Sequence, residues 1–481
     1  MLRRLLGSVT CALLLPVCTS AAAGADAASP GVSPVTGGNG VPVIFGHTSF
    51  DLATVGYTQS EFFVEGTASA YAPVTPLTTD GRWTVEPTTS EPYRTRIVVN
   101  RPERARDFNG TVVVEWLNVS GGADASPDWI HMHTELIRSG SAWVGVSAQA
   151  VGMNALKVPP LGDPVRYESL THPGDSYSYD MFSQAGQAVR DAAATVLGGL
   201  APKRVIAVGE SQSAVRLTTY IDAVHPLAGV YDGYLVHSRG AGGTPLTQPP
   251  LPAVPTPSPS LIRDDLDVPV LVFQAENDFG LTARQPDSPT FRLWEVAGTA
   301  HFDQYGLQQG ATDTGRRESV EDWFASMRNP TNQPSPNFTC DQPVNTGPQT
   351  FVLRAAISSL TRWVAGGRPP AEAPRFETIS VQPVQFAVDA DGNVLGGIRT
   401  PAVDAPVAKL SGLGQTGLSF CFLFGTTTPL TPERLAERYG SHGGFAAAWV
   451  RATNDALRAG FLLREDAHDV WVVGARSDVL R

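Results

Sequence analysis

A buried strand that runs through a serine-containing turn into an amphipathic helix is the feature that most constrains the fold. The strand predicted over 204–208 is apolar after Arg204, and Gly209–Ser213 forms the turn. The helix predicted over 213–224 repeats apolar residues at steps of three and four, which makes a stripe that can pack on a sheet. An apolar strand needs cover on both faces. The unit therefore predicts a parallel sheet with helices on either side.

Other strands and helices alternate along the chain in the same way. Short strands separated by turn residues are expected within 43–76, and longer elements follow. Further strands are predicted over 94–99, 111–116, 143–146, 268–273 and 291–296, and helices over 128–137 and 181–197. Strands that alternate with helices at this spacing indicate a three-layer α/β domain with a mostly parallel central sheet.

The domain boundaries follow from shifts in composition. The α/β core is predicted over 43–330, and a proline-rich insertion at about 240–262 makes a surface excursion between two of its strands. Residues 331–481 exceed what such a core needs to finish. They contain amphipathic helices over 351–364 and 445–461, so we expect a C-terminal subdomain that packs on the core and completes the fold.

The first 25 residues have the pattern of a secretory signal peptide. Two arginines precede the mainly apolar stretch Leu5–Val17, and Ala21–Ala28 offers several cleavage sites of the A-x-A type. Thirteen residues are too few to span a bilayer, which takes ~20 in a helix. We therefore expect a secreted protein, with residues 26–42, rich in Ala, Gly, Ser and Pro, as a flexible lead-in.

The cysteines support the same compartment. Val17 stands where a lipoprotein signal would need a small residue before Cys18, so a free secreted protein is favoured over a lipid-anchored one. The mature chain keeps Cys340 and Cys421, an even pair in an oxidising compartment. We predict a disulfide between them. Two isolated cysteines are a poor metal site, and the sequence predicts neither a metal nor a cofactor.

The charge balance narrows the partners. The formal net charge is −11, and no basic run occurs in the mature region. An acidic chain repels phosphate backbones and anionic lipid surfaces, so neither nucleic acid nor stable membrane insertion is expected. Apolar residues make up 42%, an ordinary globular level that is enough for a sizeable core.

Ser211 has the setting of a catalytic nucleophile. A tight turn between strand and helix lifts its hydroxyl above the sheet edge, and the helix N-terminus, including the Gln212 N–H, points at it and can stabilise an oxyanion. The pattern is G-x-S-x-S, so Ser213 departs from the glycine that usually ends this motif. The alternative is a serine that only caps a helix.

An acid and a base follow Ser211 in the chain order that this fold uses. Asp278 comes just after the buried strand 268–273 and is the first choice for the acid, with Glu276 as the alternative. His301 follows the strand 291–296 and a loop of small residues. The sequence thus predicts a Ser-His-Asp triad. A second oxyanion donor is expected at the N–H of Val119 or Ser120, in a glycine-containing loop after a central strand.

These segments together resemble a family of secreted bacterial α/β-hydrolase-domain proteins, common in actinobacteria, and the likeness spans nearly the whole mature chain. The matching stretches are Val114–Asn118, Gly174–Tyr177, Gly209–Ser213, Trp294–His301 and Gly396–Pro401. The resemblance implies the α/β-hydrolase fold and an esterase-like serine hydrolase. It implies no particular substrate, because fold does not determine specificity.

The expected function is hydrolysis of a small-molecule carboxylic ester through an acyl-enzyme. Acyl transfer or amide hydrolysis on the same triad remains an alternative, since all three reactions share that intermediate. From another class, the chain could be a non-catalytic binding protein on a hydrolase scaffold. In the tail, Arg399 is a candidate for binding a substrate carboxylate, although a structural ion pair is the simpler interpretation.

Overall fold

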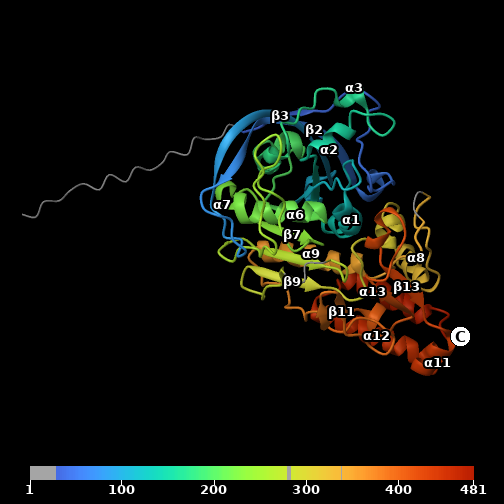
Figure 1. The fold of residues 1–481 in the computed structure, drawn as a ribbon. Coiled ribbons are helices and arrows are strands. Elements are labelled where there is room, and N and C mark those ends of the chain that lie inside the picture. Colours follow the sequence, from blue (N-terminus) through green and yellow to red (C-terminus); the bar gives the residue numbers. More distant parts are fainter. Residues whose placement is uncertain (1–28, 279–282, 337–338) are drawn as a thin grey trace, which may run out of the picture.

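A twisted sheet forms the centre of the molecule (Figure 1). Within the residues that the computed structural model describes (29–278, 283–336 and 339–481), nine strands pair in the order β1-β2-β3-β5-β4-β6-β7-β8-β9. In this order the first three pairs, β1–β2, β2–β3 and β3–β5, are antiparallel. The remaining pairs, from β5–β4 to β8–β9, are parallel. The predicted mostly parallel α/β architecture is thus confirmed. The predicted signal peptide lies outside the described residues.

The strands are β1 (Gly31–Pro34), β2 (Tyr57–Pro73), β3 (Val85–Pro102), β4 (Thr111–Trp116), β5 (Ala142–Val146), β6 (Arg204–Glu210), β7 (Gly233–His237), β8 (Val270–Gln274) and β9 (Phe291–Glu295). The α-helices are α1 (Pro127–Ser139), α2 (Ala150–Ala155), α3 (Pro164–Tyr167), α4 (Ser178–Asp191), α5 (Ala193–Val196), α6 (Gln212–Thr219), α7 (His225–Ala228), α8 (Arg317–Arg328), α9 (Gln349–Val364), α10 (Pro401–Asp404), α11 (Pro432–Tyr439), α12 (His442–Ala459) and α13 (Arg464–Arg476).

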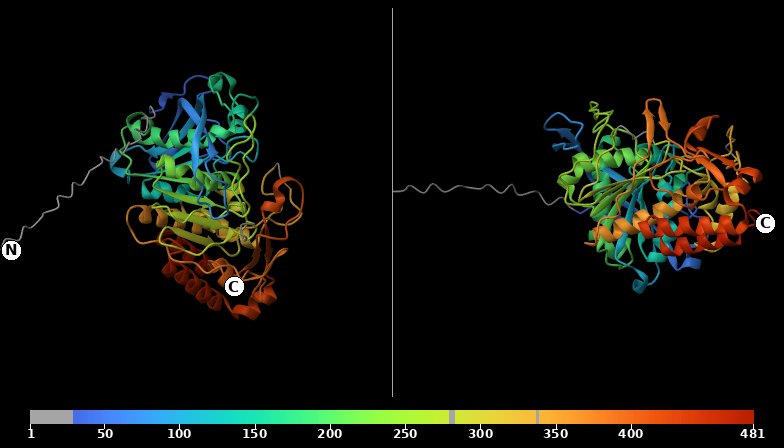
Figure 2. Two further views of the ribbon diagram at one scale, coloured as in Figure 1. Left: turned by 60° about the vertical axis from the view of Figure 1, so that its left-hand side comes forward. Right: turned by 90° about the horizontal axis from the view of Figure 1, so that it is seen from below.

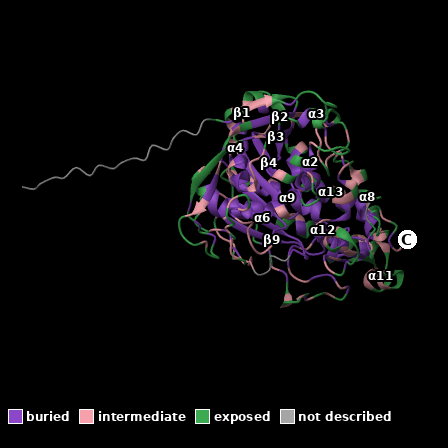
Figure 3. Ribbon diagram, turned by 45° about the horizontal axis from the view of Figure 1, so that its top comes forward, coloured by how far each residue is buried: buried purple, intermediate pink, exposed green. Residues whose placement is uncertain are grey.

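Helices cover both faces of the sheet because successive side chains of a strand point to opposite sides. On β4, Val112 and Val114 join a core that includes residues of α4 and α6, whereas Val113 joins a core with α1 and α9. All three side chains are fully buried, in the continuous interior that Figure 3 shows around the central strands. This double cover explains the uninterrupted apolar sequence of β4.

Local order at the N-terminus differs from the prediction. The lead-in expected to be flexible over 26–42 contains β1, whose Val32 pairs with Val64 of β2, and Val35 is buried in the core. A four-residue strand needs the edge of β2 to form, so its own sequence carries little signal. The helix predicted over 213–224 is α6 followed by a π-helical turn, η4 (Tyr220–Val224).

The proline-rich insertion lies between β7 and β8 and is fastened to the start of α4. Ser176 Oγ donates to the Gln248 carbonyl and accepts from the Gln248 N–H, both at 2.9 Å. The Tyr179 hydroxyl donates to the Pro245 carbonyl at 2.9 Å. Because Ser176 belongs to Gly174–Tyr177, one of the segments shared with the resembled family, its two bonds give that segment a structural role.

The C-terminal part of the chain contributes to the central layers and also forms a core of its own. Helix α9 packs against α1, β7 and β8. Farther along, α12 and α13 lie side by side among the red helices at the C-terminal end of the chain (Figure 2). Helix α8 packs on α13. Two small antiparallel pairs complete this part: β10 (Thr378–Val381) with β11 (Val384–Phe386), and β12 (Ala408–Ser411) with β13 (Thr426–Pro429).

The predicted disulfide is present. Cys340 and Cys421, 81 residues apart, are bonded in a small buried cluster with Val344. Closing a loop of this length stabilises a fold by up to about 4–5 kcal/mol in the chain-entropy model. In the part of the chain described here, no helix combines the length and apolar character needed to cross a bilayer.

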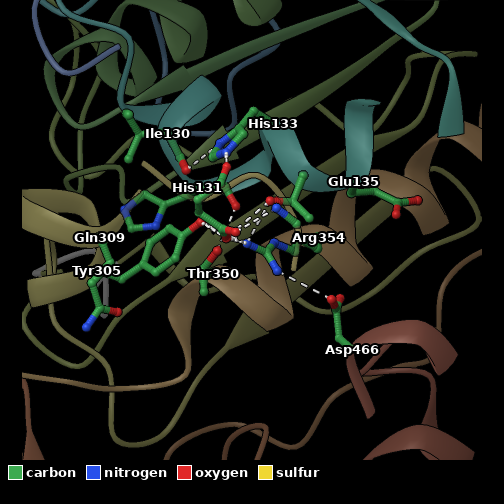
Figure 4. A network of polar contacts seen from close by, with 12 residues as sticks. Ile130, His131, His133, Glu135, Tyr305, Gln309, Thr350, Arg354 and Asp466 are labelled. Atoms are coloured by element: carbon green, nitrogen blue, oxygen red, sulfur yellow. Dashed lines mark hydrogen bonds and ion pairs between the residues drawn. The ribbon is translucent and has the colours of Figure 1, made fainter. Parts of the chain in front are cut away.

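Arg354 of α9 joins the central layers to the C-terminal helices (Figure 4). Its side chain is 3% exposed, and its guanidinium lies 2.8 Å from Asp313 and 3.3 Å from Asp466 of α13. It also donates to the Tyr305 hydroxyl and to Thr134 of α1. The charge of Arg354 helps to hold the pKa of Asp313 below its usual range although burial opposes this. Asp313 therefore depends on this guanidinium, whereas Asp466 also pairs with Arg138 of α1 at 2.7 Å.

We expect Arg354→Met to lower the free energy of unfolding by about 3–5 kcal/mol, because the change leaves Asp313 buried without its guanidinium partner, while Asp466 keeps its ion pair with Arg138. Arg362→Met is the matched control, since Arg362 lies on the same helix, is exposed, and bonds only to two serines. Its effect should stay below about 0.5 kcal/mol. Urea unfolding followed by circular dichroism measures both, and equal losses would contradict the assignment.

Candidate active site

The turn after β6 holds Ser211 in a conformation that few non-glycine residues adopt. Its φ is 58° and its ψ is −119°, and α6 begins at the next residue. The Ser211 N–H donates to the His237 carbonyl at the end of β7, at 2.9 Å. This hydrogen bond fixes the turn at the carboxyl edge of the sheet. The side chain is half-buried there.

Strand and helix approach each other closely at this turn. A Cβ atom on Gly209 would lie 3.1 Å from the backbone carbonyl carbon of Ser213 and 3.0 Å from Leu217 Cδ1. Glycine at 209 is therefore what permits the tight crossing. Ser213 is fully buried in the place where the motif usually has its last glycine, so a small side chain fits.

Three consecutive residues after β8 bind the loop that carries His301. Glu276 accepts a hydrogen bond from the Gly298 N–H at 2.6 Å, and Asn277 accepts one from the His301 N–H at 2.6 Å. Asp278 Oδ1 lies 2.6 Å from His301 Nδ1. The backbone and the ring of the histidine are thus fixed by adjacent side chains from the neighbouring strand.

The imidazole of His301 connects the acid to the serine. Its Nε2 lies 2.7 Å from Ser211 Oγ, opposite the Nδ1 that contacts Asp278. The alternative acid, Glu276, uses its second oxygen to accept from the Gly412 N–H at 2.8 Å. Burial raises the pKa of Glu276 to about 7. The structure brings Asp278, and not Glu276, into contact with the histidine.

A second acid that the sequence reasoning missed also reaches His301. Glu210 Oε1 lies 3.2 Å from His301 Nε2, and the Glu210 side chain is 5% exposed. Asn118 Nδ2 donates to the other carboxylate oxygen and to the Glu210 carbonyl, both at 3.1 Å. The sequence signal for Glu210 was an ionisable residue directly before Ser211. The G-x-S-x-G motif allows any residue at that position, so it gives Glu210 no significance.

The charges around His301 shift its proton equilibrium. Burial lowers the pKa of His301, but the neighbouring charges of Glu210 and Asp278 outweigh this and raise it to about 9. Burial raises the pKa of Glu210 to about 7, against the opposing effect of His301. The two groups face each other, so each favours the charged form of its partner.

The predicted oxyanion donors lie at the first residue of α6 and in the loop after β4, which Asn118 joins to Glu210 next to Ser211. Among the described residues, no acceptor binds the backbone N–H of Gln212 or of Val119, whereas the Ser120 N–H donates to Asn118 Oδ1 at 2.8 Å. The Gln212 side chain is held by Gln149 at 2.9 Å. Of the two residues predicted in the loop after β4, Val119 therefore has the available donor.

Arg399 lies in ion pairs within the C-terminal part. It contacts Asp389 at 2.8 Å and Asp404 at 2.6 Å, which agrees with the simpler interpretation of this residue. Among the residues that the structure describes, no group of three or more His, Cys, Asp or Glu side chains is arranged to hold a metal ion.

We expect Gly209→Ala to lower the free energy of unfolding by about 1–3 kcal/mol, because the added methyl group presses on the backbone of Ser213. Gly443→Ala provides a control in the first turn of α12, where a Cβ meets only Ser441 Oγ at 3.9 Å. That variant should be slightly more stable than the wild type. Thermal unfolding of the two purified variants compares them, and an unaffected Gly209→Ala would argue against the close crossing.

Comparison with known proteins gives both a family and weaker structural likenesses. An esterase structure from Rhizomucor miehei has 11% identity and a TM-score of 0.29, covering 63% of this chain and 85% of that one. A serine hydrolase from Xanthomonas campestris has 13% identity and a TM-score of 0.27, covering 43% and 80%. A putative dienelactone hydrolase from Klebsiella pneumoniae has 11% identity and a TM-score of 0.27, covering 55% and 97%.

A search of curated proteins found no match. The family model described as "Alpha/beta hydrolase domain" matches residues 30–471, which is nearly all of the described chain. It spans the central sheet, the turn at Ser211 and most of the C-terminal helices. The chain belongs to the alpha/beta hydrolase domain family.

Proposed function

We propose that the protein is a secreted serine hydrolase that cleaves carboxylic esters, with Ser211, His301 and Asp278 as its catalytic triad. The observation that carries this proposal is the unbroken series of contacts at the sheet edge. Ser211 Oγ lies 2.7 Å from His301 Nε2, and His301 Nδ1 lies 2.6 Å from Asp278. These are hydrogen-bonding distances, and the order of groups is the one that activates a serine.

Acylation begins when His301 Nε2 takes the hydroxyl proton of Ser211 as Oγ attacks the ester carbonyl carbon. Asp278 accepts a hydrogen bond from His301 Nδ1–H, which leaves Nε2 unprotonated and able to receive the serine proton. The carbonyl oxygen becomes an oxyanion, for which the N–H groups of Gln212 and Val119 are the donors. The C–O bond then breaks, and His301 returns the proton to the leaving alcohol.

Deacylation repeats these steps with water as the nucleophile. His301 removes a proton from the water molecule as its oxygen attacks the acyl carbon on Ser211. Collapse of the second oxyanion releases the carboxylic acid, and the proton on His301 returns to Ser211 Oγ. Acyl transfer to an alcohol and hydrolysis of an amide use the same intermediate, so they differ only in the acceptor or the leaving group.

Secretion is supported by chemistry as well as by the N-terminal pattern. The bond between Cys340 and Cys421 is compatible with an oxidising compartment. The apolar stretch that follows two arginines at the N-terminus has the pattern of a secretory signal peptide.

Replacing Ser211 by alanine should abolish hydrolysis of p-nitrophenyl esters, because it removes the attacking oxygen. We expect a loss of at least about 10⁴-fold in kcat/KM at an unchanged melting temperature. The same wild-type preparation is assayed on p-nitroanilides and on esters with an added alcohol, which report amide hydrolysis and acyl transfer. Turnover that survives in Ser211→Ala would exclude the triad.

Substitutions of the two acids after β8 should have different effects on activity and on stability. Asp278→Asn removes the acceptor for His301 Nδ1–H and should lower kcat by about 10⁴-fold. Glu276→Gln loses one backbone hydrogen bond and should cost stability of about 1–3 kcal/mol, with kcat of the folded protein within about tenfold. Comparing kcat with melting temperature distinguishes the two, and the reverse pattern would assign the acid to Glu276.

A further inference from the structure

His301 lies between two carboxyl groups, one at each ring nitrogen. Asp278 contacts Nδ1 at 2.6 Å, and Glu210 lies 3.2 Å from Nε2, the atom that also faces Ser211 Oγ. We propose that Glu210 is a positioning residue whose carboxylate stabilises the protonated imidazole of His301 from the Nε2 side. This inference deepens the proposed function and rests on it, because it concerns the same histidine.

Glu210 is held in place from both its backbone and its side chain. It is the last residue of β6 and pairs with His237 in the parallel ladder to β7. Asn118 Nδ2 donates to its carbonyl and to its Oε2, which leaves Oε1 directed at the histidine. A carboxylate fixed in this way keeps its distance to Nε2 without spending side-chain entropy during the reaction.

The other charged groups near Glu210 do not replace His301 as its partner. His237 faces it from β7, but the His237 Nδ1 lies 2.9 Å from Asp128 of α1, and both side chains are fully buried. Asp128 and Asp278 are acids and add only negative charge near Glu210. The cation that Glu210 meets is therefore the imidazolium of His301.

The proton transfer creates positive charge where the two carboxylates can act on it. When Oγ attacks, its proton moves to Nε2, and the imidazolium then lies between Asp278 and Glu210. An opposite charge at this distance favours the protonated imidazole. The same interaction keeps the resting histidine protonated up to a higher pH. While Nε2 carries this proton, it cannot accept the proton of Ser211.

The pH window follows from the two groups. Burial raises the pKa of Glu210 to about 7, so Glu210 is ionised above that pH. Although burial opposes it, the charges of Glu210 and Asp278 raise the pKa of His301 to about 9, which is where the base becomes available. Reactivity of Ser211 should therefore rise with pH toward this value. Removing the Glu210 charge should move the rise to lower pH.

The test is the second-order rate constant for labelling Ser211 with a fluorophosphonate, measured from pH 5 to 10. Glu210→Gln should lower the midpoint of the pH profile by about 1–3 units and lower the plateau by up to about tenfold per unit. Glu210→Asp keeps the charge but withdraws it by one methylene, so its midpoint should fall between the two. A midpoint for Glu210→Gln that equals the wild-type value would overturn the inference.

Glu276→Gln is the matched control. Glu276 is another buried glutamate whose pKa burial raises to about 7, but it bonds to backbone N–H groups and not to the His301 ring. Its pH midpoint should match that of the wild type, and a shift as large as that of Glu210→Gln would overturn the specific role of Glu210.

Two further readouts separate this inference from the proposed function. A wild-type protein whose Ser211 is never labelled would overturn the triad itself, whereas labelling with unchanged midpoints overturns only the role of Glu210. NMR titration of the His301 ring in the wild-type protein needs no variant. A midpoint well above the ordinary ~6.5 supports the inference, and one at or below that value contradicts it.

Discussion

Parallel pairing of β6, β7, β8 and β9 is the constraint on which the site depends. Because the carboxyl ends of parallel strands meet at one edge, the residues that follow β6, β8 and β9 emerge together. Ser211, Asp278 and His301 come from these three positions. His301 is 90 residues from Ser211 and 23 residues from Asp278 along the chain, and it contacts both. The hydrogen bond from the Ser211 N–H to the end of β7 fixes the serine within this edge.

The acids and amides that surround His301 can be buried at one edge because they have defined hydrogen-bond partners. The side-chain oxygens of Glu276 and Asn277 accept hydrogen bonds from backbone N–H groups of the neighbouring loop, including that of His301. Asn118 donates its side-chain N–H groups to the carbonyl and the carboxylate of Glu210. An unpaired buried donor or acceptor costs about 1–3 kcal/mol, so this bonding is what makes a rigid polar edge compatible with a stable fold.

The sequence was sufficient for features with a local or periodic signal. The buried strand β4, the strand–turn–helix at Ser211 and the two long C-terminal helices all follow from apolar patterns and turn residues. Other features depend on distant partners. Strand β1 exists because β2 offers it an edge, and the contact of Glu210 with His301 joins positions 91 residues apart, so neither has a signature of its own. Asn277 was missed for the same reason, since amides carry no charge pattern.

Helix α9 has a consequence for when this protein can fold. It covers β7 and β8 with residues that begin at Gln349, well after the last strand of the sheet has been made. Until that segment emerges, Leu235, Leu271 and Phe273 have no helix over them on that side. During synthesis from the N-terminus, this face of β7 and β8 therefore lacks its helix until α9 has been made, and the sheet completes its packing late. A fragment that stops before Gln349 would therefore leave the apolar side chains of β7 and β8 exposed on that side.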